Sequence, residues 1–389
     1  TPPDTSSAAS DVYKRQLPTP AVPLMIKTLR ADIGVMITAS HNTYEYNGLK
    51  FFDSTGTKLS SLIEQKVEKI VLDNKKYSKI SNNTFVSGNA RRLEDASGRY
   101  SEFLKSTLNK TSSKRKLKIV LDCANGATYN IAPNLFWELG HNIIAINNNP
   151  DGLNINKNCG AVDVKSLSQN VIKEKADIGF AFDGDGDRLI VVDEEGKEVD
   201  GDKIIGLLCK SYVKPKKKSN QHDVIITVMS NMGLENYLTN KLKLKIKRTS
   251  VGDINVINQM KKSKSMIGGE QSGHIILSEH SNTGDGILAA LKITEILISN
   301  KNKASKLFDL YNDFPQDKIN LRYKTKNTKL LKILGKLKND KLYNNKKIRS
   351  LVRLSGTEPL VRILVEGQEI TEVKKKSLEI KRLVRPYLG

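Results

Sequence analysis

Short apolar runs bounded by turn residues recur along the chain, and most are followed by a stretch with helical spacing. A run of five or six apolar residues between turns is typical of a buried strand, whereas apolar residues three and four apart indicate a helix. The predicted strands cover 32–38, which we expect to be buried, and 116–122, 142–147, 176–182, 188–193, 223–228 and the two arms of 350–366. The predicted helices run from the prolines at 18–23 to about residue 30, from 128 to 139, and over 234–241, 286–299 and 371–385. Because strands and helices alternate, the predicted fold class is α/β.

The alternation forms three βα modules, followed by a smaller strand–turn–strand and a final helix. A chain of 389 residues with 38% hydrophobic content can bury several separate cores. Residues 1–16 have no apolar period and a turn-forming composition, which predicts an unstructured or foreign lead-in. The predicted α/β domains are 17–113, 114–207 and 208–314, and a smaller α+β domain covers 315–389; a Lys/Asn-rich stretch near 300–346 receives no element.

Neither the apolar segments nor the cysteines indicate a membrane or an oxidising compartment. No window approaches the ~18 consecutive apolar residues of a spanning helix, and the N-terminus lacks the basic-then-apolar pattern of a signal peptide. Cys123, Cys159 and Cys209 are an odd, scattered set without the spacing of a zinc site or a disulfide framework. We expect buried free thiols in a soluble, cytoplasmic protein that binds no membrane.

The chain carries 64 Lys and Arg against 42 Asp and Glu, a formal net charge of +22. Basic runs such as 214–218 make a nucleic-acid-binding protein an alternative from a different class. The lysines are nevertheless spread over many segments, aromatic residues make up only 6%, and no known nucleic-acid-binding pattern accompanies them. We therefore expect no nucleic-acid partner, and the same charge would attract an anionic substrate.

Ser40 follows an apolar strand and precedes His41, so its hydroxyl would be presented at a turn. Most loop serines close a turn or cap a helix, and that alternative stays open for Ser40 taken alone. The flanking glycines of the G-x-S-x-G elbow are absent, which excludes the nucleophile of an α/β-hydrolase. Ser40 is a candidate nucleophile in combination with other segments.

Asp183, Asp185 and Asp187 alternate with glycines in one tight loop. Such a concentration of carboxylate oxygens suits Mg²⁺ or Ca²⁺, and without a cation the three charges would repel. An EF-hand is excluded because its sixth position must be Gly and is Arg188, and because the flanking segments are predicted strands. A solvated acidic turn is the alternative to a metal site.

Two further glycine-containing loops carry the polar groups that a phosphosugar needs. The first can hydrogen-bond several sugar hydroxyls, and it contains Glu270, Gln271, Ser272 and His274. The second can bind a phosphate dianion through guanidinium groups and backbone amides, and it contains Arg353, Ser355, Gly356 and Thr357, with Arg362 nearby. An ordinary polar loop and a hairpin with solvated arginines are the alternatives. Taken together, the four segments predict phosphoryl transfer on a phosphosugar, where positioning and charge neutralisation supply most of the catalysis.

These motifs resemble those of the α-D-phosphohexomutase superfamily, and within it those of the phosphoglucosamine mutase family. The resemblance runs from about residue 17 to the C-terminus and includes the segments 38–42, 183–188, 269–274 and 353–359 in order. Residues 151–156 with Cys159 and Gly160, and Gln271 where the glucose and mannose enzymes usually carry Met, are similar to the glucosamine branch. The resemblance implies three related α/β domains and a smaller C-terminal domain around one cleft.

The resemblance also implies a mechanism. Ser40 would be phosphorylated, with Mg²⁺ held by the phosphoserine oxygen and by Asp183, Asp185 and Asp187. The phosphoserine would interconvert glucosamine 6-phosphate and glucosamine 1-phosphate through glucosamine 1,6-bisphosphate, for UDP-N-acetylglucosamine and cell-wall synthesis. The candidates for proton transfer and charge neutralisation are Lys50, His274 and His41. The implied substrate-binding residues are Arg188, Glu270, Ser272, Arg353, Ser355, Gly356, Thr357 and Arg362.

The chain departs from the family pattern in three places. Thr43 stands where Pro commonly follows His-Asn, and Ile254 where the family often has Arg. The family's N-terminal segment, with its first strand and an arginine-bearing loop, is absent. We therefore expect an incomplete first domain with an open sheet edge, and an impaired enzyme or an inactive fragment. A phosphoglucomutase or phosphomannomutase of the same superfamily is the nearest alternative, and the resemblance permits a homodimer.

Overall fold

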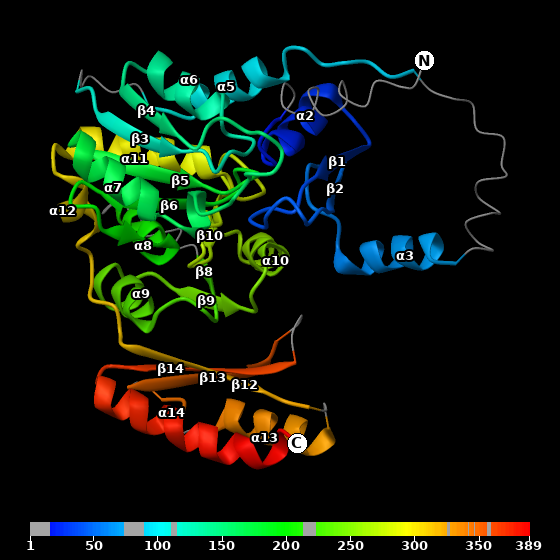
Figure 1. Ribbon diagram of the computed structural model, residues 1–389, viewed down its shortest axis with the longest axis vertical. Helices are drawn as coiled ribbons and strands as arrows, with labels where there is room; N and C mark the ends of the chain where they lie inside the picture. Colours follow the sequence, from blue (N-terminus) through cyan, green and yellow to red (C-terminus); the bar gives the residue numbers. More distant parts are fainter. Residues whose placement is uncertain are drawn as a thin grey trace. The chain divides into compact units, whose positions relative to one another are not determined.

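The computed structural model describes residues 16–73, 89–109, 115–212, 223–324, 327–340, 342–345, 347–355 and 359–389. These residues form two compact units (Figure 1). The first holds the described parts of Thr1–Thr227 and Leu244–Leu310, and the second holds Val228–Lys243 and the described parts of Tyr311–Gly389. Most of the predicted lead-in, the basic run 214–218, Gly356 and Thr357 lie outside the described residues.

A five-stranded sheet with the order β4-β3-β5-β6-β7 forms the centre of the first unit. Strand β3 is parallel to both of its neighbours, whereas β5, β6 and β7 are joined as antiparallel hairpins. Helix α6 packs against β4, α7 against β3 and β5, and α11 against β5 and β6, so the central strands are buried. The strands are β3 (Lys118–Asp122), β4 (Asn142–Ile146), β5 (Ile178–Phe182), β6 (Leu189–Asp193) and β7 (Glu198–Val199), and the helices are α6 (Ile131–Glu138), α7 (Lys165–Glu174) and α11 (Gly286–Asn300). The predicted α/β fold class is confirmed. The strands predicted at 116–122, 142–147, 176–182 and 188–193 correspond to β3, β4, β5 and β6.

A four-stranded sheet with the order β11-β10-β8-β9 lies in the same unit. Its strands β10, β8 and β9 are parallel, and β11 is antiparallel to β10. Helices α8 and α10 pack against it. The strands are β8 (Val224–Thr227), β9 (Ile246–Thr249), β10 (Ile267–Gly269) and β11 (Ile275–Leu277), and the helices are α8 (Gly201–Tyr212) and α10 (Asp253–Ser263).

The strand predicted at 32–38 exists, but its predicted burial is wrong. Strand β1 (Ile33–Ile37) pairs with β2 (Leu49–Asp53) in an antiparallel sheet of two strands. Helix α2 (Ala21–Leu29) packs against one face of this sheet at Gly34. Side chains alternate between the faces of a strand, so Ile33, Val35 and Ile37 point away from α2 and are 55%, 47% and 68% exposed. No described element covers that face.

Helix α5 (Ala96–Ser106) is fixed to α11 by buried polar contacts. The hydroxyl of Tyr100 donates to Asp285 Oδ2 at 2.9 Å, and both side chains are buried. The other oxygen of Asp285 caps α11 by accepting from the Leu288 amide. Lys292, also buried, donates to the Thr107 carbonyl at the end of α5. These contacts satisfy groups that would otherwise be costly to bury.

Tyr100→Phe is expected to lower the free energy of unfolding by about 1–3 kcal/mol at pH 8, and by less at pH 5. Burial raises the pKa of Asp285 to about 6, above its ordinary 3.8, so between these values the folded state binds more protons and stability falls as the pH rises. Without the tyrosine hydroxyl that pKa rises further, so the loss grows as the pH increases through 6. Denaturant unfolding at pH 5 and pH 8 measures the loss of unfolding free energy, and Tyr44→Phe, at an exposed site, is the control. An equal loss at pH 5 and pH 8 would contradict the role of the carboxylate.

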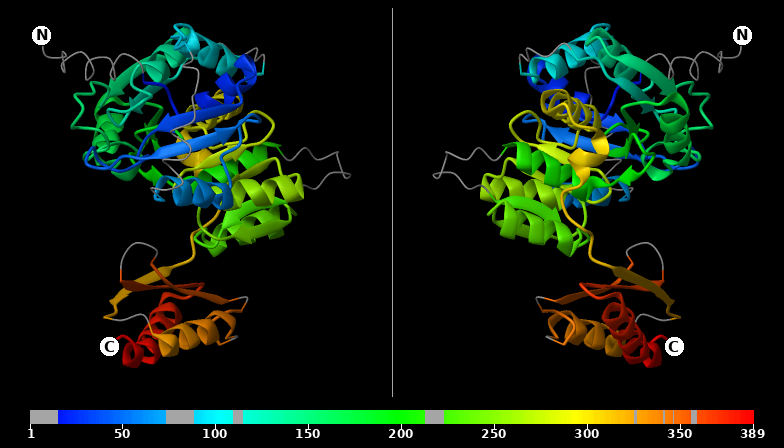
Figure 2. Two further views of the ribbon diagram at one scale, coloured as in Figure 1. Left: turned by 90° about the vertical axis from the view of Figure 1, so that its right-hand side faces the viewer. Right: turned by 90° about the vertical axis from the view of Figure 1, so that its left-hand side faces the viewer.

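The second unit is built on a three-stranded antiparallel sheet with the order β12-β14-β13. Helices α13 and α14 pack against it, as both views in Figure 2 show. The stretch that received no element contains β12 and α13, whose Leu330, Leu334 and Leu337 enter the core at helical spacing. The predicted helix 234–241 is a short α-helix, α9, continued by a π-helical turn at Tyr237–Lys241. The bounds are β12 (Gln316–Arg322), β13 (Ile348–Leu354), β14 (Leu360–Gly367), α9 (Met232–Asn236), α13 (Thr328–Asn339) and α14 (Ile370–Val384).

Cys123, Cys159 and Cys209 are free and buried, as predicted. Burial raises the pKa of the Cys159 and Cys209 thiols to about 12, so both stay protonated near neutral pH. None of the helices in the described part of the chain has the length and hydropathy that crossing a lipid bilayer requires.

Candidate active site

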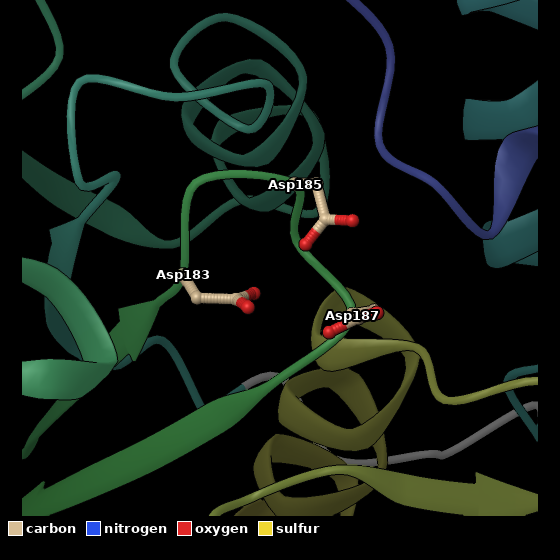
Figure 3. A group of neighbouring side chains, drawn as sticks. All are labelled: Asp183, Asp185 and Asp187. Atoms are coloured by element: carbon tan, nitrogen blue, oxygen red, sulfur yellow. The ribbon is translucent and has the colours of Figure 1, made fainter. Parts of the chain in front are cut away.

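Three carboxylates meet where the hairpin of β5 and β6 turns. β5 ends at Phe182 and β6 begins at Leu189, so Asp183, Asp185 and Asp187 all fall in the connection between two buried strands. One carboxylate oxygen from each lies within 4.8 Å of the others, and all three residues are buried (Figure 3). Three carboxylates this close repel one another unless positive charges lie nearby, so the charged groups around the loop determine the protonation of the three aspartates.

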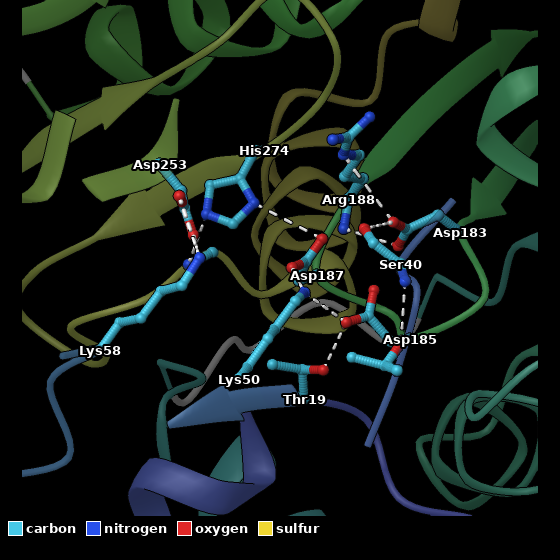
Figure 4. Close-up of polar contacts among 12 residues, drawn as sticks. Thr19, Ser40, Lys50, Lys58, Asp183, Asp185, Asp187, Arg188, Asp253 and His274 are labelled. Atoms are coloured by element: carbon cyan, nitrogen blue, oxygen red, sulfur yellow. Dashed lines mark hydrogen bonds and ion pairs between the residues drawn. The ribbon is translucent and has the colours of Figure 1, made fainter. Parts of the chain in front are cut away.

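Two side chains from the N-terminal part of the chain reach these carboxylates (Figure 4). Lys50 on β2 donates to Asp185 Oδ2 at 2.6 Å and to Asp187 Oδ2 at 2.8 Å. Thr19, just before α2, donates its hydroxyl to Asp185 Oδ2 at 2.5 Å. Although burial opposes it, the carboxylates of Asp187 and Asp185 raise the pKa of Lys50, so the ammonium stays charged. Lys50 in turn helps to hold the pKa of Asp187 well below its usual range, against the effect of burial.

Ser40 lies against the same loop in a strained backbone conformation. Its φ is 57°, in the left-handed region that residues with a Cβ seldom adopt. Its amide donates to Thr38 Oγ1 at 2.9 Å, and its hydroxyl donates to Asp183 Oδ2 at 3.1 Å. Burial and the neighbouring Asp187 raise the pKa of Asp183 well above its usual range. The predicted nucleophile and the predicted metal loop are therefore adjacent.

The loop 269–274 is joined directly to the start of β6. The amide of Leu189 donates to the Gly273 carbonyl at 2.9 Å, and Arg188 forms a β-bridge with His274. Gly273 is required here because its φ is 90° and a Cβ would lie 2.3 Å from the Leu189 carbonyl oxygen. This junction brings the two predicted loops together, although 80 residues separate them in the sequence.

His274 is buried and has protein groups at both ring nitrogens. Nδ1 lies 3.5 Å from Asp187 Oδ1, and Nε2 accepts from the Gly284 amide at 3.1 Å. Although burial opposes it, the Asp187 carboxylate raises the pKa of His274. A Cβ at Gly284 would lie 2.5 Å from the imidazole, so the ring fills the available space. His274 is thus adjacent to the carboxylates, but the protein encloses it.

The other predicted residues of the first unit differ in exposure. Glu270 is buried, and its Oε1 accepts from the Gly252 amide at 2.9 Å, whereas Ser272 is exposed. His41 is exposed beside Ser40, and partial desolvation together with the Arg188 guanidinium lowers its pKa. The backbone amide of Arg188 donates to the carboxylate of the metal loop's first aspartate at 3.1 Å.

Sequence reasoning missed three residues that hold this site. The sequence places Thr19 only in a helix-initiating segment, and it does not predict the Lys58–Asp253 ion pair at 3.1 Å, which links the segment after β2 to the first residue of α10. His274 and Lys58 lower the pKa of Asp253, although burial opposes this. Polar residues flanking a proline-rich turn and a helix start are common, so their sequence carried no distinguishing signal.

The carboxylate group fits a hard divalent cation. Asp185 Oδ1 is buried and accepts no hydrogen bond among the described residues, and Asp187 Oδ1 has only the 3.5 Å contact with His274. Free lone pairs on buried carboxylate oxygens are the ligands that Mg²⁺ prefers. Within the described part of the chain, this is also the one cluster of His, Cys, Asp and Glu with metal-binding proximity.

The predicted phosphate-binding residues that are described belong to the second unit. Arg353 on β13 and Arg362 on β14 are directly opposite each other in the sheet register. Burial and the neighbouring Arg362 lower the pKa of Arg353. Like charges in opposite positions are unfavourable, and a bound anion would relieve the repulsion. Ser355 follows β13, and its amide donates to the Leu360 carbonyl at 2.8 Å.

Four family models match the chain in order along its length. They are described as phosphoglucomutase/phosphomannomutase alpha/beta/alpha domains I, II and III, at residues 7–78, 98–196 and 200–314, and the C-terminal domain of the same enzymes, at 319–381. The segments 38–42, 183–188, 269–274 and 353–359 each fall within one of these matches.

Curated relatives match over nearly the whole chain. A phosphoglucosamine mutase from Caldicellulosiruptor bescii is 44% identical over 99% of this chain and 86% of that protein, and one from Nautilia profundicola is 43% identical over 96% and 83%. Among solved structures, a phosphoglucomutase/phosphomannomutase family protein from Burkholderia thailandensis has a TM-score of 0.79 at 21% identity, covering 95% of this chain and 81% of that one. The Aspergillus fumigatus N-acetylphosphoglucosamine mutase in complex with GlcNAc-6P and magnesium has a TM-score of 0.65 at 20% identity, covering both chains fully. These structural likenesses support the fold.

Proposed function

We propose that this chain, which belongs to the phosphoglucosamine mutase family of the α-D-phosphohexomutase superfamily, interconverts glucosamine 6-phosphate and glucosamine 1-phosphate. The family consists of phosphosugar mutases, which are isomerases. The observation that carries the proposal is the Ser40 hydroxyl within hydrogen-bonding distance of a buried aspartate cluster that also holds the charged Lys50. A hydroxyl, a cation site and a fixed ammonium are the groups that phosphoryl transfer needs.

The reaction proceeds in two phosphoryl transfers. The phosphoryl group on Ser40 Oγ passes to O1 of glucosamine 6-phosphate, which breaks the Oγ–P bond, forms an O1–P bond and gives glucosamine 1,6-bisphosphate. After the sugar turns over, the 6-phosphoryl group passes to Ser40 Oγ and leaves glucosamine 1-phosphate. The proton lost from O1 in the first transfer is matched by the proton gained at O6 in the second, so the enzyme returns to its phosphorylated state.

Lys50 and His41 suit different tasks in these transfers. Lys50 has a raised pKa and remains cationic, so it neutralises charge on the transferring group rather than accepting a proton. His41 is exposed beside Ser40 with a lowered pKa, so its imidazole is neutral near pH 7 and can accept the proton of the attacking hydroxyl. His274 is enclosed by Asp187 and Gly284, so it supports the carboxylate.

Asp183, Asp185 and Asp187 hold Mg²⁺ in this proposal, together with an oxygen of phosphorylated Ser40. The free carboxylate oxygens in the loop support the assignment. When bound, the ion would offset the negative charge of the phosphoryl group.

The remaining residues bind the substrate. Glu270 and Ser272 hydrogen-bond the sugar hydroxyls, and the Arg188 guanidinium, whose Nε lies 3.8 Å from Asp183 Oδ2, adds a positive charge beside the metal loop. Arg353 and Arg362 bind the phosphate that is not being transferred, and their opposite positions in the sheet register support this role. We assign Ser355, Gly356 and Thr357 to the same anion site. The product would enter UDP-N-acetylglucosamine synthesis in the cytoplasm.

Turnover of three substrates tests the proposal. With Mg²⁺ and a sugar 1,6-bisphosphate as activator, kcat/KM is expected to be at least about tenfold higher for glucosamine 6-phosphate than for glucose 6-phosphate or mannose 6-phosphate. Preference for glucose or mannose phosphate would instead assign the chain to a phosphoglucomutase or phosphomannomutase. Absence of turnover on all three, with no phosphate on Ser40, would reject mutase activity for this chain.

A further inference from the structure

The segment 151–160, which resembles the glucosamine branch of the family, contributes no residue to the proposed phosphoryl transfer. It follows β4 and belongs to the same part of the first unit as the metal loop. Within it, Asn156 is 3% exposed, and its backbone amide donates to the Ala124 carbonyl at 3.0 Å. The nearby Gly160 amide donates to the buried Asp122 at 2.9 Å. The segment is therefore tied to the loop that follows β3.

The side chain of Asn156 leaves this segment and holds the serine loop. Its Nδ2 donates to the Ser40 carbonyl at 2.9 Å and to the Asn42 carbonyl at 2.8 Å. A primary amide has two N–H groups, and here each has one acceptor. Its Oδ1 accepts no hydrogen bond among the described residues, so donation alone determines how the amide is oriented.

Close packing around the Asn156 amide requires glycine at position 184 of the metal loop. A Cβ at Gly184 would lie 2.6 Å from Asn156 Nδ2 and 2.8 Å from the Ser40 carbonyl oxygen. Gly184 does not have a positive φ, so space rather than backbone freedom requires glycine there. The amide, the serine carbonyl and the metal loop therefore meet at one point.

Ser40 needs such support because its φ of 57° is strained for a residue with a Cβ. Strained backbone persists when neighbouring contacts fix it. The two carbonyl contacts act on both sides of His41, and so they fix the peptide groups that orient the Ser40 Cβ–Oγ bond. The hydroxyl then points at Asp183, 3.1 Å away.

We propose that Asn156 is a positioning residue for phosphoryl transfer, because its amide holds the loop of Ser40–Asn42 in the conformation that presents the Ser40 hydroxyl to the metal loop. It acts through Ser40, because among the described residues its side-chain amide donates to the two loop carbonyls and not to the carboxylates of the metal loop. Its effect on turnover rests on the proposed mutase function, whereas its effect on the loop does not.

Asn156→Gly tests this role with a matched control. Asn156 has a φ of 57°, which glycine tolerates, so the substitution removes the amide with little backbone cost. Asn158 has nearly the same φ, 54°, and is exposed, so Asn158→Gly makes the same chemical change without touching the serine loop. Asn156→Asp keeps the side-chain size but replaces the donating NH2 group with an accepting oxygen, and it provides the comparison if the glycine variant fails to fold.

Two measurements are made on each variant. Amide hydrogen exchange of peptides covering 38–46 is expected to be faster in Asn156→Gly and Asn156→Asp than in the unaltered chain or Asn158→Gly, with the core strands β3 and β5 unchanged. With glucosamine 6-phosphate, kcat is expected to fall about 10- to 100-fold while KM stays within about threefold, since a small misplacement of a reacting group costs rate rather than binding.

Equal exchange in the Asn156 and Asn158 variants would overturn the inference, whatever the activity. Faster exchange with unchanged kcat would overturn the catalytic part of it. If the unaltered chain shows no turnover, the proposed mutase function fails, and the exchange comparison still decides whether Asn156 holds the loop.

Discussion

Ser40→Ala is expected to abolish mutase turnover, by at least about 10⁴-fold, while the protein stays folded. The phosphoryl carrier is lost, and no other hydroxyl is described at hydrogen-bonding distance from Asp183. Alanine keeps a Cβ at a φ of 57°, so the backbone strain is the same in both proteins. Coupled turnover assays measure the loss, and peptide mass spectrometry checks that the phosphate of the unaltered chain is on Ser40.

Ser54→Ala provides the control for that experiment. Ser54 is exposed in the turn after β2, so its replacement should leave turnover within about twofold, as for most surface substitutions. Near-normal turnover of Ser40→Ala would reject Ser40 as the phosphoryl carrier. A phosphate found on another residue of an active chain would do the same.

Removal of divalent metal is expected to stop turnover, and Mg²⁺ is expected to restore it. In thermal unfolding, Mg²⁺ at a hundredfold excess over Kd should stabilise the unaltered chain by about 2.7 kcal/mol, because the ion binds only the folded state. Asp185→Asn should remove most of this stabilisation, since Asp185 Oδ1 is a free ligand atom in the loop. Without metal the loop is still partly compensated, because Lys50 lies between Asp185 and Asp187.

Glu195→Gln is the matched control, because Glu195 is an exposed carboxylate in the turn after β6. Its replacement should leave the Mg²⁺-dependent stabilisation unchanged. Stabilisation of Asp185→Asn by Mg²⁺ to the same extent as the unaltered chain would show that the ion binds elsewhere. Full turnover after chelation would exclude a metal from the reaction.

The elements that sequence predicted best are the apolar strands of the central sheet. β3, β5 and β6 are buried on both faces, so each forms a continuous apolar run that local pattern identifies. β12 was missed because it has only two apolar residues, Ile319 and Leu321, and α13 was missed because lysines interrupt its apolar positions. The burial predicted for β1 was wrong for a different reason, because an apolar run shows what a strand could bury and not whether another element covers it.

The sequence by itself determined the groups that are contiguous in the chain: three carboxylates in one loop, a serine at the end of a strand, and two polar glycine loops. Spacing is enough for these because a short loop keeps its own residues together. Only the tertiary structure decided which of them meet. It joined the loop of His274 to β6, placed Lys50 between two aspartates, and enclosed a histidine that had been expected to transfer protons. It also revealed Asn156, whose two hydrogen bonds span more than 110 residues of sequence. Such contacts depend on how strands and loops pack, and no local pattern encodes them.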